Sequence, residues 1–141
     1  METLRYPAKI TQEDEAYIVL FRDLEGCHTF GDTLEEARAM AQEALDCYLE
    51  ACLQEGIKVN RPSVKLDDET EFFPSVEVSV PLLLRFCRED HNMTMIQMAN
   101  AMDIAYQNYQ AIESGKRKNL TLITLKKAFA AIGCQARLQL G

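Results

Sequence analysis

One amphipathic stretch, residues 33–55, constrains the fold of this chain more than any other feature of its sequence. Thr33, with Glu36 three residues later, forms a capping box, and Gly56 follows as a stop signal. Between these signals apolar residues recur every three or four positions: Leu34, Ala37, Ala41, Ala44, Leu45, Tyr48, Leu49 and Cys52. The pattern predicts a long helix with one buried stripe, which must pack against another element.

The segments around this helix read as β-strands. Residues 4–10 and 16–21 are predicted to form a hairpin, and a third short strand is expected at 28–30. After an exposed acidic excursion at 67–71, the alternating residues 76–80 are predicted to return as the last strand. Because so few strands are not stable alone, we expect the helix to cover one face of a small sheet.

The second half of the chain changes character, because every signal in it is helical. Helices are expected at 82–90, 95–102, 106–113 and 121–132, which together would make a small bundle. Residues 135–140 could add a short closing strand. The predicted fold is therefore α+β, with one domain at 1–75, whose last strand extends to 80, and an all-α domain at 81–141.

Composition excludes several classes of protein. Of the 141 residues 48% are hydrophobic, which is too many for a disordered acidic tail. No run approaches the ~18 apolar residues of a membrane span, and the first ten residues lack the apolar core of a signal peptide. The five cysteines include no Cys-x-x-Cys pair and no cluster with the two histidines. We therefore expect a cytoplasmic protein without a metal, a cofactor or a membrane partner.

Charge divides the chain unevenly. Residues 1–75 carry seven Lys/Arg and seventeen Asp/Glu, whereas residues 76–141 carry eight Lys/Arg and five Asp/Glu. An acidic domain repels nucleic acid and suits a basic protein partner, so any contact with nucleic acid must come from the second half. Random variation of surface charge is the alternative explanation.

Spacing within the second half is typical of a helix-turn-helix. This motif needs a small residue where its two helices touch, an apolar residue after the turn, and two apolar residues that dock the second helix. Ala99, Ile104, Tyr109 and Ile112 occupy these positions. With the ending Glu113-Ser114-Gly115-Lys116, residues 82–133 resemble the Cro and phage-repressor class of helix-turn-helix domains.

Two positions depart from the pattern of this class. Asp103 stands at the turn between the helices, where the class usually has Gly, and Asp tolerates the left-handed conformation better than most residues. Met95 stands where the class usually has a Gln that contacts phosphate, which puts that contact in doubt. The resemblance also implies that Arg88 pairs with Glu113, although two unrelated exposed charges are the alternative.

If this fold is right, the start of the second motif helix faces DNA. Gln and Asn side chains can bond adenine edges in the major groove, and the residues expected to contact bases are Tyr106, Gln107, Asn108 and Gln110. The residues expected to contact phosphates are Thr94, Lys116, Arg117, Lys118 and Asn119, for which a solvated run of charges is the alternative. One such module covers a single half-site, so a homodimer on double-stranded operator DNA is expected, and further assembly into tetramers is left open.

The first half carries a second resemblance. Tyr6-Pro7-Ala8, residues 17–27, residues 29–37 and Arg61-Pro62-Ser63 are similar to the HicB antitoxins, whose pattern reads Tyr-Pro, Gly-Tyr-x-Val-x-Phe-x-Asp-x-x-Gly, Gly-x-Thr-x-x-Glu-Ala and Pro-Ser. Ala16 departs from it, where the family often has Gly. Together the two resemblances cover nearly the whole chain.

The HicB resemblance implies a type II toxin–antitoxin system. The first domain, a partial RNase H-like fold, would bind and block a small basic RNA-cleaving toxin of the HicA type, while the second domain would repress the operon. Asp23, Leu24 and Glu25 are the expected toxin contacts, as an exposed acidic and apolar segment; a simple turn is the alternative.

Two other functions compete with this interpretation. A stand-alone HicB-like regulator without a toxin would share every sequence feature. A metal-dependent nuclease would need several carboxylates converging on two metal ions. Asp23, Glu25 and Asp32 lie in predicted turns that no rigid element brings together, so we expect no catalytic residue and no enzyme activity.

Overall fold

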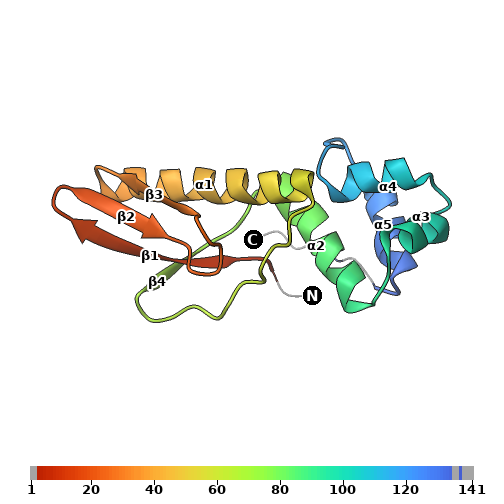
Figure 1. Cartoon of the computed structure of the whole chain (residues 1–141), viewed down its shortest axis with the longest axis horizontal. Coiled ribbons are helices and arrows are strands. Elements are labelled where there is room, and N and C mark those ends of the chain that lie inside the picture. The colour runs from red at the N-terminus through yellow and green to blue at the C-terminus, as the bar shows by residue number, and fades with distance from the viewer. Residues whose placement is uncertain (1–2, 135–136, 138–141) are drawn as a thin grey trace. The chain divides into compact units, whose positions relative to one another are not determined.

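The computed structural model describes residues 3–134 and residue 137, and it divides the chain into two compact units with the boundary between Ser79 and Val80 (Figure 1). The first unit contains an antiparallel sheet and one long helix, whereas the second is helical. The predicted α+β class is therefore confirmed.

Four antiparallel strands form the sheet of the first unit, in the order β3-β2-β1-β4. They are β1 (Tyr6–Glu13), β2 (Ala16–Leu20), β3 (His28–Gly31) and β4 (Glu69–Phe72). The hairpin between β1 and β2 turns at Asp14, whose φ of 53° is a left-handed conformation that Asp tolerates. β1 thus runs to Glu13, three residues further than the sequence predicts, because its pairing with Ala16 continues to the tip of the hairpin.

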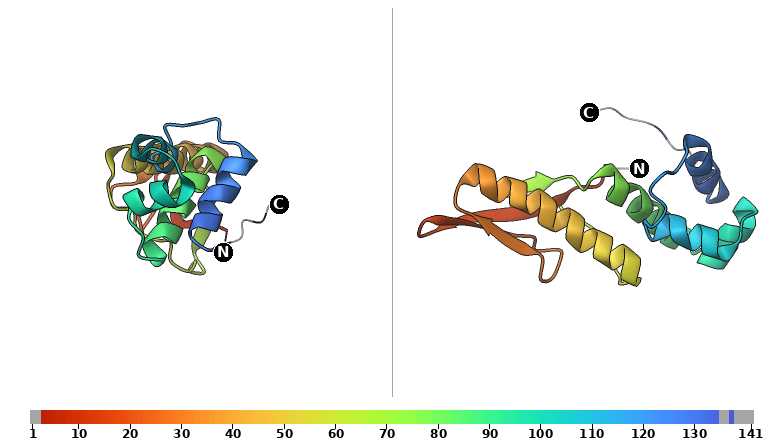
Figure 2. Two further views of the ribbon diagram at one scale, coloured as in Figure 1. Left: turned by 90° about the vertical axis from the view of Figure 1, so that its right-hand side faces the viewer. Right: turned by 90° about the horizontal axis from the view of Figure 1, so that it is seen from above.

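Helix α1 (Leu34–Glu55) lies across one face of this sheet (Figures 1 and 2). The Thr33 Oγ accepts a hydrogen bond from the Glu36 amide at its start, and Gly56, with φ 68°, ends it. Gly31 lies where β3 meets the helix, and a Cβ there would come within 2.4 Å of the Ala37 nitrogen. The helix predicted at 33–55 is therefore confirmed, and its close approach to the sheet requires glycine at the end of β3.

The core of the first unit lies between this helix and the sheet. Val19 on β2 is fully buried, as are the stripe residues Leu45 and Leu49 on α1. Tyr6 on β1 is also buried and donates a hydrogen bond from its hydroxyl to the Asn60 carbonyl. Burial raises the pKa of Tyr6 well above its ordinary value of 10.0, so this hydroxyl keeps its proton.

The last strand of the sheet lies at 69–72, and the prediction of a strand at 76–80 is wrong. Residues 76–80 open helix α2 (Val76–Asp90), which contains the boundary between the units. The amides of Val78 and Ser79 donate to the Ser75 carbonyl and begin the helix. The valines at every second position of 76–80 give the sequence pattern of a strand. In the structure, however, Val78, Leu82 and Phe86 are buried at the four-residue spacing of a helix.

The acidic segment predicted as an exposed excursion supplies this strand instead. Its charges are neutralised by basic residues of its neighbours, since Asp68 meets Lys9 at 3.4 Å and Glu71 meets Arg5 at 3.0 Å. Glu69 is buried and accepts two hydrogen bonds from Arg22, at 2.8 and 3.0 Å. These bonds lower the pKa of Glu69, so the carboxylate stays charged inside the sheet.

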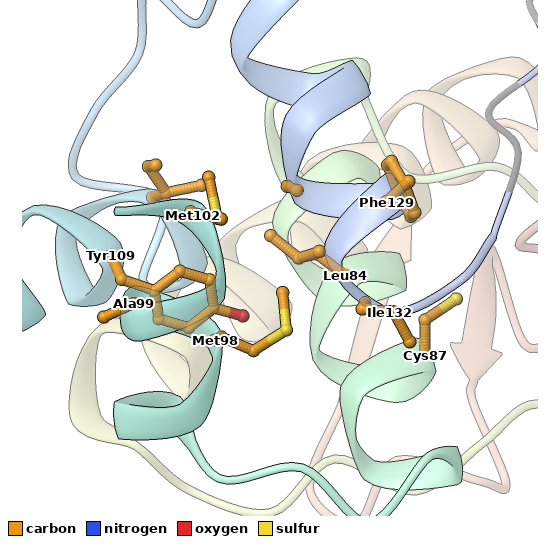
Figure 3. Packing of buried hydrophobic residues seen from close by; sticks show 10 residues of the cluster. Leu84, Cys87, Met98, Ala99, Met102, Tyr109, Phe129 and Ile132 are labelled. Carbon is orange, nitrogen blue, oxygen red and sulfur yellow. The ribbon is translucent and has the colours of Figure 1, made fainter. Parts of the chain in front are cut away.

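In the part of the second unit that the structure describes, four helices surround one apolar core. After the part of α2 that lies beyond the boundary come α3 (Met95–Met102), α4 (Tyr106–Glu113) and α5 (Leu122–Ala131). The core residues include Leu84, Met98, Tyr109 and Phe129 (Figure 3). The helices predicted after residue 90 are confirmed within a residue at each end. Apart from Arg137, the closing strand expected at 135–140 lies outside the described residues.

We predict that Asp103→Gly stabilises the chain by up to about 1 kcal/mol, because Asp103 has a φ of 56° that glycine adopts without steric cost. Asp103→Val should destabilise it by about 1–2 kcal/mol, because a β-branched side chain resists this conformation. Urea unfolding followed by circular dichroism measures both. Destabilisation by the glycine variant would show that the Asp103 side chain itself holds the turn.

Candidate nucleic-acid interface and partner surface

Helices α3 and α4 are joined by a turn only three residues long. α3 starts with a complete capping box, in which the Thr94 Oγ accepts from the Gln97 amide at 3.1 Å and the Gln97 side chain accepts from the Thr94 amide at 2.8 Å. It ends at Asp103, whose amide donates back to the helix. Ala99 is buried, and its carbonyl accepts from the Ile104 amide. These contacts fix the angle between the two helices.

A buried ion pair ties α4 to α2. The Arg88 guanidinium reaches the Glu113 carboxylate with Nη2 at 2.7 Å and Nε at 2.9 Å, and its Nη1 donates to the Met93 carbonyl. Arg85 lies 3.7 Å from the same carboxylate. Only 1% of Glu113 is exposed to solvent. The structure thus brings together Arg88 and Glu113, the two residues that the sequence analysis paired.

The Tyr109 hydroxyl completes this cluster by donating to the Glu113 carboxylate. Sequence reasoning placed Tyr109 in the core as an apolar docking residue and missed this polar role. Burial, followed by the charge of Glu113, raises the pKa of Tyr109 far above its ordinary value of 10.0. The hydroxyl therefore remains a donor at any physiological pH, and α4 is held through both its apolar and its polar groups.

The outer face of α4 carries the residues expected to contact bases. Tyr106, Gln107, Asn108 and Gln110 are exposed, whereas Tyr109, which lies among them, and Ile112, which follows them, are buried. No capping side chain precedes them, because the N-cap residue is Ala105. The first amides of α4 are therefore not bonded by a cap side chain and can meet a phosphate.

Basic residues follow α4 in an exposed loop. Lys116, Arg117, Lys118 and Asn119 are all exposed, and the Arg117 amide donates to the Ala111 carbonyl, which fixes the loop to α4. Thr94, the other expected phosphate contact, is exposed at the start of α3. Its hydroxyl oxygen accepts the Gln97 amide, and its hydroxyl hydrogen can donate to a phosphate oxygen.

A cleft of about 250 Å³ lies beside these residues, within the second unit. Asn108 and Arg117 line it together with Thr124 and Lys127 of α5. Sequence reasoning missed the two α5 residues. Their three-residue spacing, which places them on one side of a helix, was the available signal.

The expected contacts on the first unit are arranged differently from the prediction. Leu24 is only 2% exposed, because the turn at 21–27 folds it inward, with the Cys27 amide donating to the Leu24 carbonyl. The Asp23 side chain accepts bonds from the Ser63 amide and hydroxyl, at 2.7 and 2.6 Å. Of the three residues, only Glu25 is exposed. The description of these three residues as one exposed segment is therefore wrong, because two of them hold the turn and the 57–68 loop.

Across the described part of the chain, no group of three or more His, Cys, Asp or Glu side chains is arranged to hold a metal ion. No helix among the same residues is long and apolar enough to cross a membrane.

Fold and site together define a class: a helix-turn-helix unit of the DNA-binding type, preceded by an acidic unit in which a helix covers a small sheet. Comparison with known proteins narrows this class. Residues 6–82 match the model of the HicB-like antitoxins of bacterial toxin–antitoxin systems, and residues 84–138 match a helix-turn-helix family. The chain belongs to the HicB-like antitoxin family.

Individual relatives agree with this assignment. The chain is 31% identical to Antitoxin HicB 1 of Photorhabdus laumondii, over 99% of its own length and 89% of that protein. It is 34% identical to Antitoxin HicB 2 of the same organism over 58% of the chain and 59% of that protein. An uncharacterized 14.9 kDa protein of Haemophilus phage HP1 is 38% identical over 36% of the chain and 38% of its own length.

We predict that Glu113→Ala destabilises the chain by about 3–5 kcal/mol, because it leaves the Arg88 guanidinium partly buried without its carboxylate. Urea unfolding measures the loss. Arg5→Ala is the control, because it removes an exposed pair with Glu71 and should change stability by less than about 1 kcal/mol. Equal, small effects of both substitutions would mean that the buried cluster does not hold the unit together.

Proposed function

We propose that this chain is an antitoxin that neutralises a HicA-type RNA-cleaving toxin by direct binding and represses its own operon by binding operator DNA. The first unit binds the toxin, and the second binds DNA as a homodimer. Membership of the HicB-like antitoxin family is the observation that carries the proposal. The chain acts in this scheme by occupying surfaces and not by catalysis.

Charge supports the division of labour between the units. Residues 1–79 carry seven Lys/Arg against eighteen Asp/Glu, whereas residues 80–141 carry eight Lys/Arg against four Asp/Glu. A positive surface steers a protein to DNA, and a negative one attracts a basic partner. In the second unit the exposed cations of the 116–118 loop, with Lys127 in the adjoining cleft, would contact phosphates beside α4.

Dimerisation follows from the small size of the second unit. A single helix-turn-helix reads one half-site, and useful affinity comes from two copies about 34 Å apart on the DNA. We therefore expect a palindromic operator with half-sites one helical turn apart.

Substitution of an exposed Gln and of an exposed Lys in the second unit should weaken DNA binding in different ways. Gln107→Ala should weaken binding about tenfold at the operator and little on a scrambled duplex, because this side chain reads a base. Lys116→Ala should weaken binding to both duplexes and reduce the slope of log K against log[salt] by about one. Titration of the full chain with DNA from upstream of its own gene, at several salt concentrations, measures both.

Matched controls for this test come from the first unit. Gln54→Ala and Lys58→Ala remove the same side-chain types from exposed positions there and should leave DNA binding unchanged. Equal losses from Gln107→Ala on both duplexes would contradict its assignment as a base-reading residue.

The antitoxin role predicts inhibition of a small basic protein encoded next to this chain. Added in equal amounts, the full chain should abolish RNA cleavage by that protein, because the acidic unit covers its basic surface. An RNA-cleavage assay measures the effect. If no neighbouring gene encodes such a protein while the operator is still bound, the second candidate applies, a stand-alone regulator, which the helix-turn-helix match supports equally well.

A further inference from the structure

The sheet of the first unit has one covered face and one open face. Directly paired residues of antiparallel strands point to the same side, and successive residues point to opposite sides. Val19 is fully buried on the side of α1 and pairs with Ile10 and Thr29. Its neighbours on β2, Ile18 and Leu20, therefore point to the face that α1 does not cover (Figure 2).

Three apolar side chains meet on this open face, and we name them the open-face patch: Ile18, Leu20 and Phe30. Phe30 of β3 lies directly opposite Ile18, and it is diagonal to Leu20, whose partner is His28. Direct neighbours are ~5 Å apart and diagonal ones within reach of an aromatic ring, so the three are contiguous. Phe30 is 63% exposed and Leu20 51%, although each lies beside a well-packed core. Ile18 is half-buried, so the patch exposes mainly Leu20 and Phe30. Neighbouring exposed apolar side chains favour a contact surface.

Charged groups surround the open-face patch in an uneven way. Lys9, which pairs with Leu20 across β1 and β2, is held by Asp68 at 3.4 Å. The cations at the other end of the sheet, Arg5 and Arg22, are likewise held by Glu71 and Glu69. The tip of the hairpin, in contrast, carries exposed carboxylates at 13–15, and Glu13 lies on the same face as Lys9 by its position in β1. The rim of the patch is therefore negative at the hairpin end, and beside Leu20 it is an ion pair.

The negative charge beside this apolar patch determines which kind of protein can bind there. With eighteen Asp/Glu against seven Lys/Arg in residues 1–79, a second copy of this unit would be repelled as it approached. Interfaces commonly combine an apolar centre with a polar rim of complementary charge. A small basic protein with apolar side chains at the middle of its basic surface meets both requirements.

We infer that the open-face patch is the surface on which the first unit docks a small basic protein. Apolar side chains of the partner cover Phe30 and Leu20, and its Lys and Arg residues meet Glu13 and the hairpin tip. The inference rests on the proposed function, since a HicA-type toxin is the partner of this chemistry. It replaces the turn at 23–25 as the principal contact.

The test compares full-length variants that change apolar area without changing charge. The probe is the small basic protein encoded beside this chain, made in a form that cannot cleave RNA, and binding is measured by calorimetry. Leu20→Gln/Phe30→Gln should weaken binding by at least about 30-fold, as expected for residues at the centre of an interface. Met40→Gln is the control, because Met40 is an apolar residue of α1 that is 38% exposed. It should bind like the unchanged chain.

Each outcome has a distinct meaning. Unchanged binding by the double variant, with normal thermal unfolding, would overturn the docking surface and leave the antitoxin function standing. Absence of binding by the unchanged chain would overturn both. If the double variant changes its oligomeric state, measured by light scattering, but still binds the basic protein normally, the face contacts a second copy of the chain. That result would overturn the inference. Slower association of Glu13→Gln, most evident at low salt, would support the predicted role of the rim.

Discussion

The Glu113 carboxylate is the group on which the second unit depends most. It is almost completely removed from water, which is costly unless the charge is fully compensated, and it receives bonds from Arg88 on α2 and from Tyr109 on its own helix. Because these donors come from two helices, the cluster sets where α4 lies as well as stabilising it. The outer face of α4 is thus presented in one orientation before DNA binds, and less ordering is required on binding.

The first unit must accommodate an excess of carboxylates in a small volume, which would otherwise repel one another. Those closest to the sheet, Glu69 and Glu71, are held by Arg22 and Arg5. Others do structural work, as Asp23 does in holding Ser63. Exposed carboxylates also lie at the hairpin tip, on α1 and in the loops at Glu25, Asp32 and Asp67. The surface left exposed is therefore negative, with the apolar open-face patch within it.

Local signals in the sequence predicted most of the fold, and long-range pairing accounts for the errors. The caps at Thr33, Thr94 and Thr121 depend on neighbouring residues, so every helix that they begin was predicted. β4 could not be predicted from its own residues, because this acidic segment pairs with β1 beside two cations, Lys9 of β1 and Arg5 just before it. At the site, the Arg88–Glu113 contact was anticipated by family resemblance, whereas burial of Leu24 and the position of Lys127 needed the folded chain.

The pairing of β1 with β4 has a consequence for the order in which the chain folds during synthesis. β1, β2, β3 and α1 are close together in sequence. The pairing of β1 with β4, in which Tyr6 lies opposite Phe72, joins residues far apart in the sequence and can form only later. The hairpin can form in microseconds. The backbone N–H and C=O groups on the other edge of β1 stay unpaired until residues 69–72 have left the ribosome. The first unit can then close as a whole before the helix-turn-helix is complete, since domains fold in the order of their synthesis. The surface proposed to bind the toxin, on the first unit, would therefore be complete before the surface proposed to bind DNA, on the second.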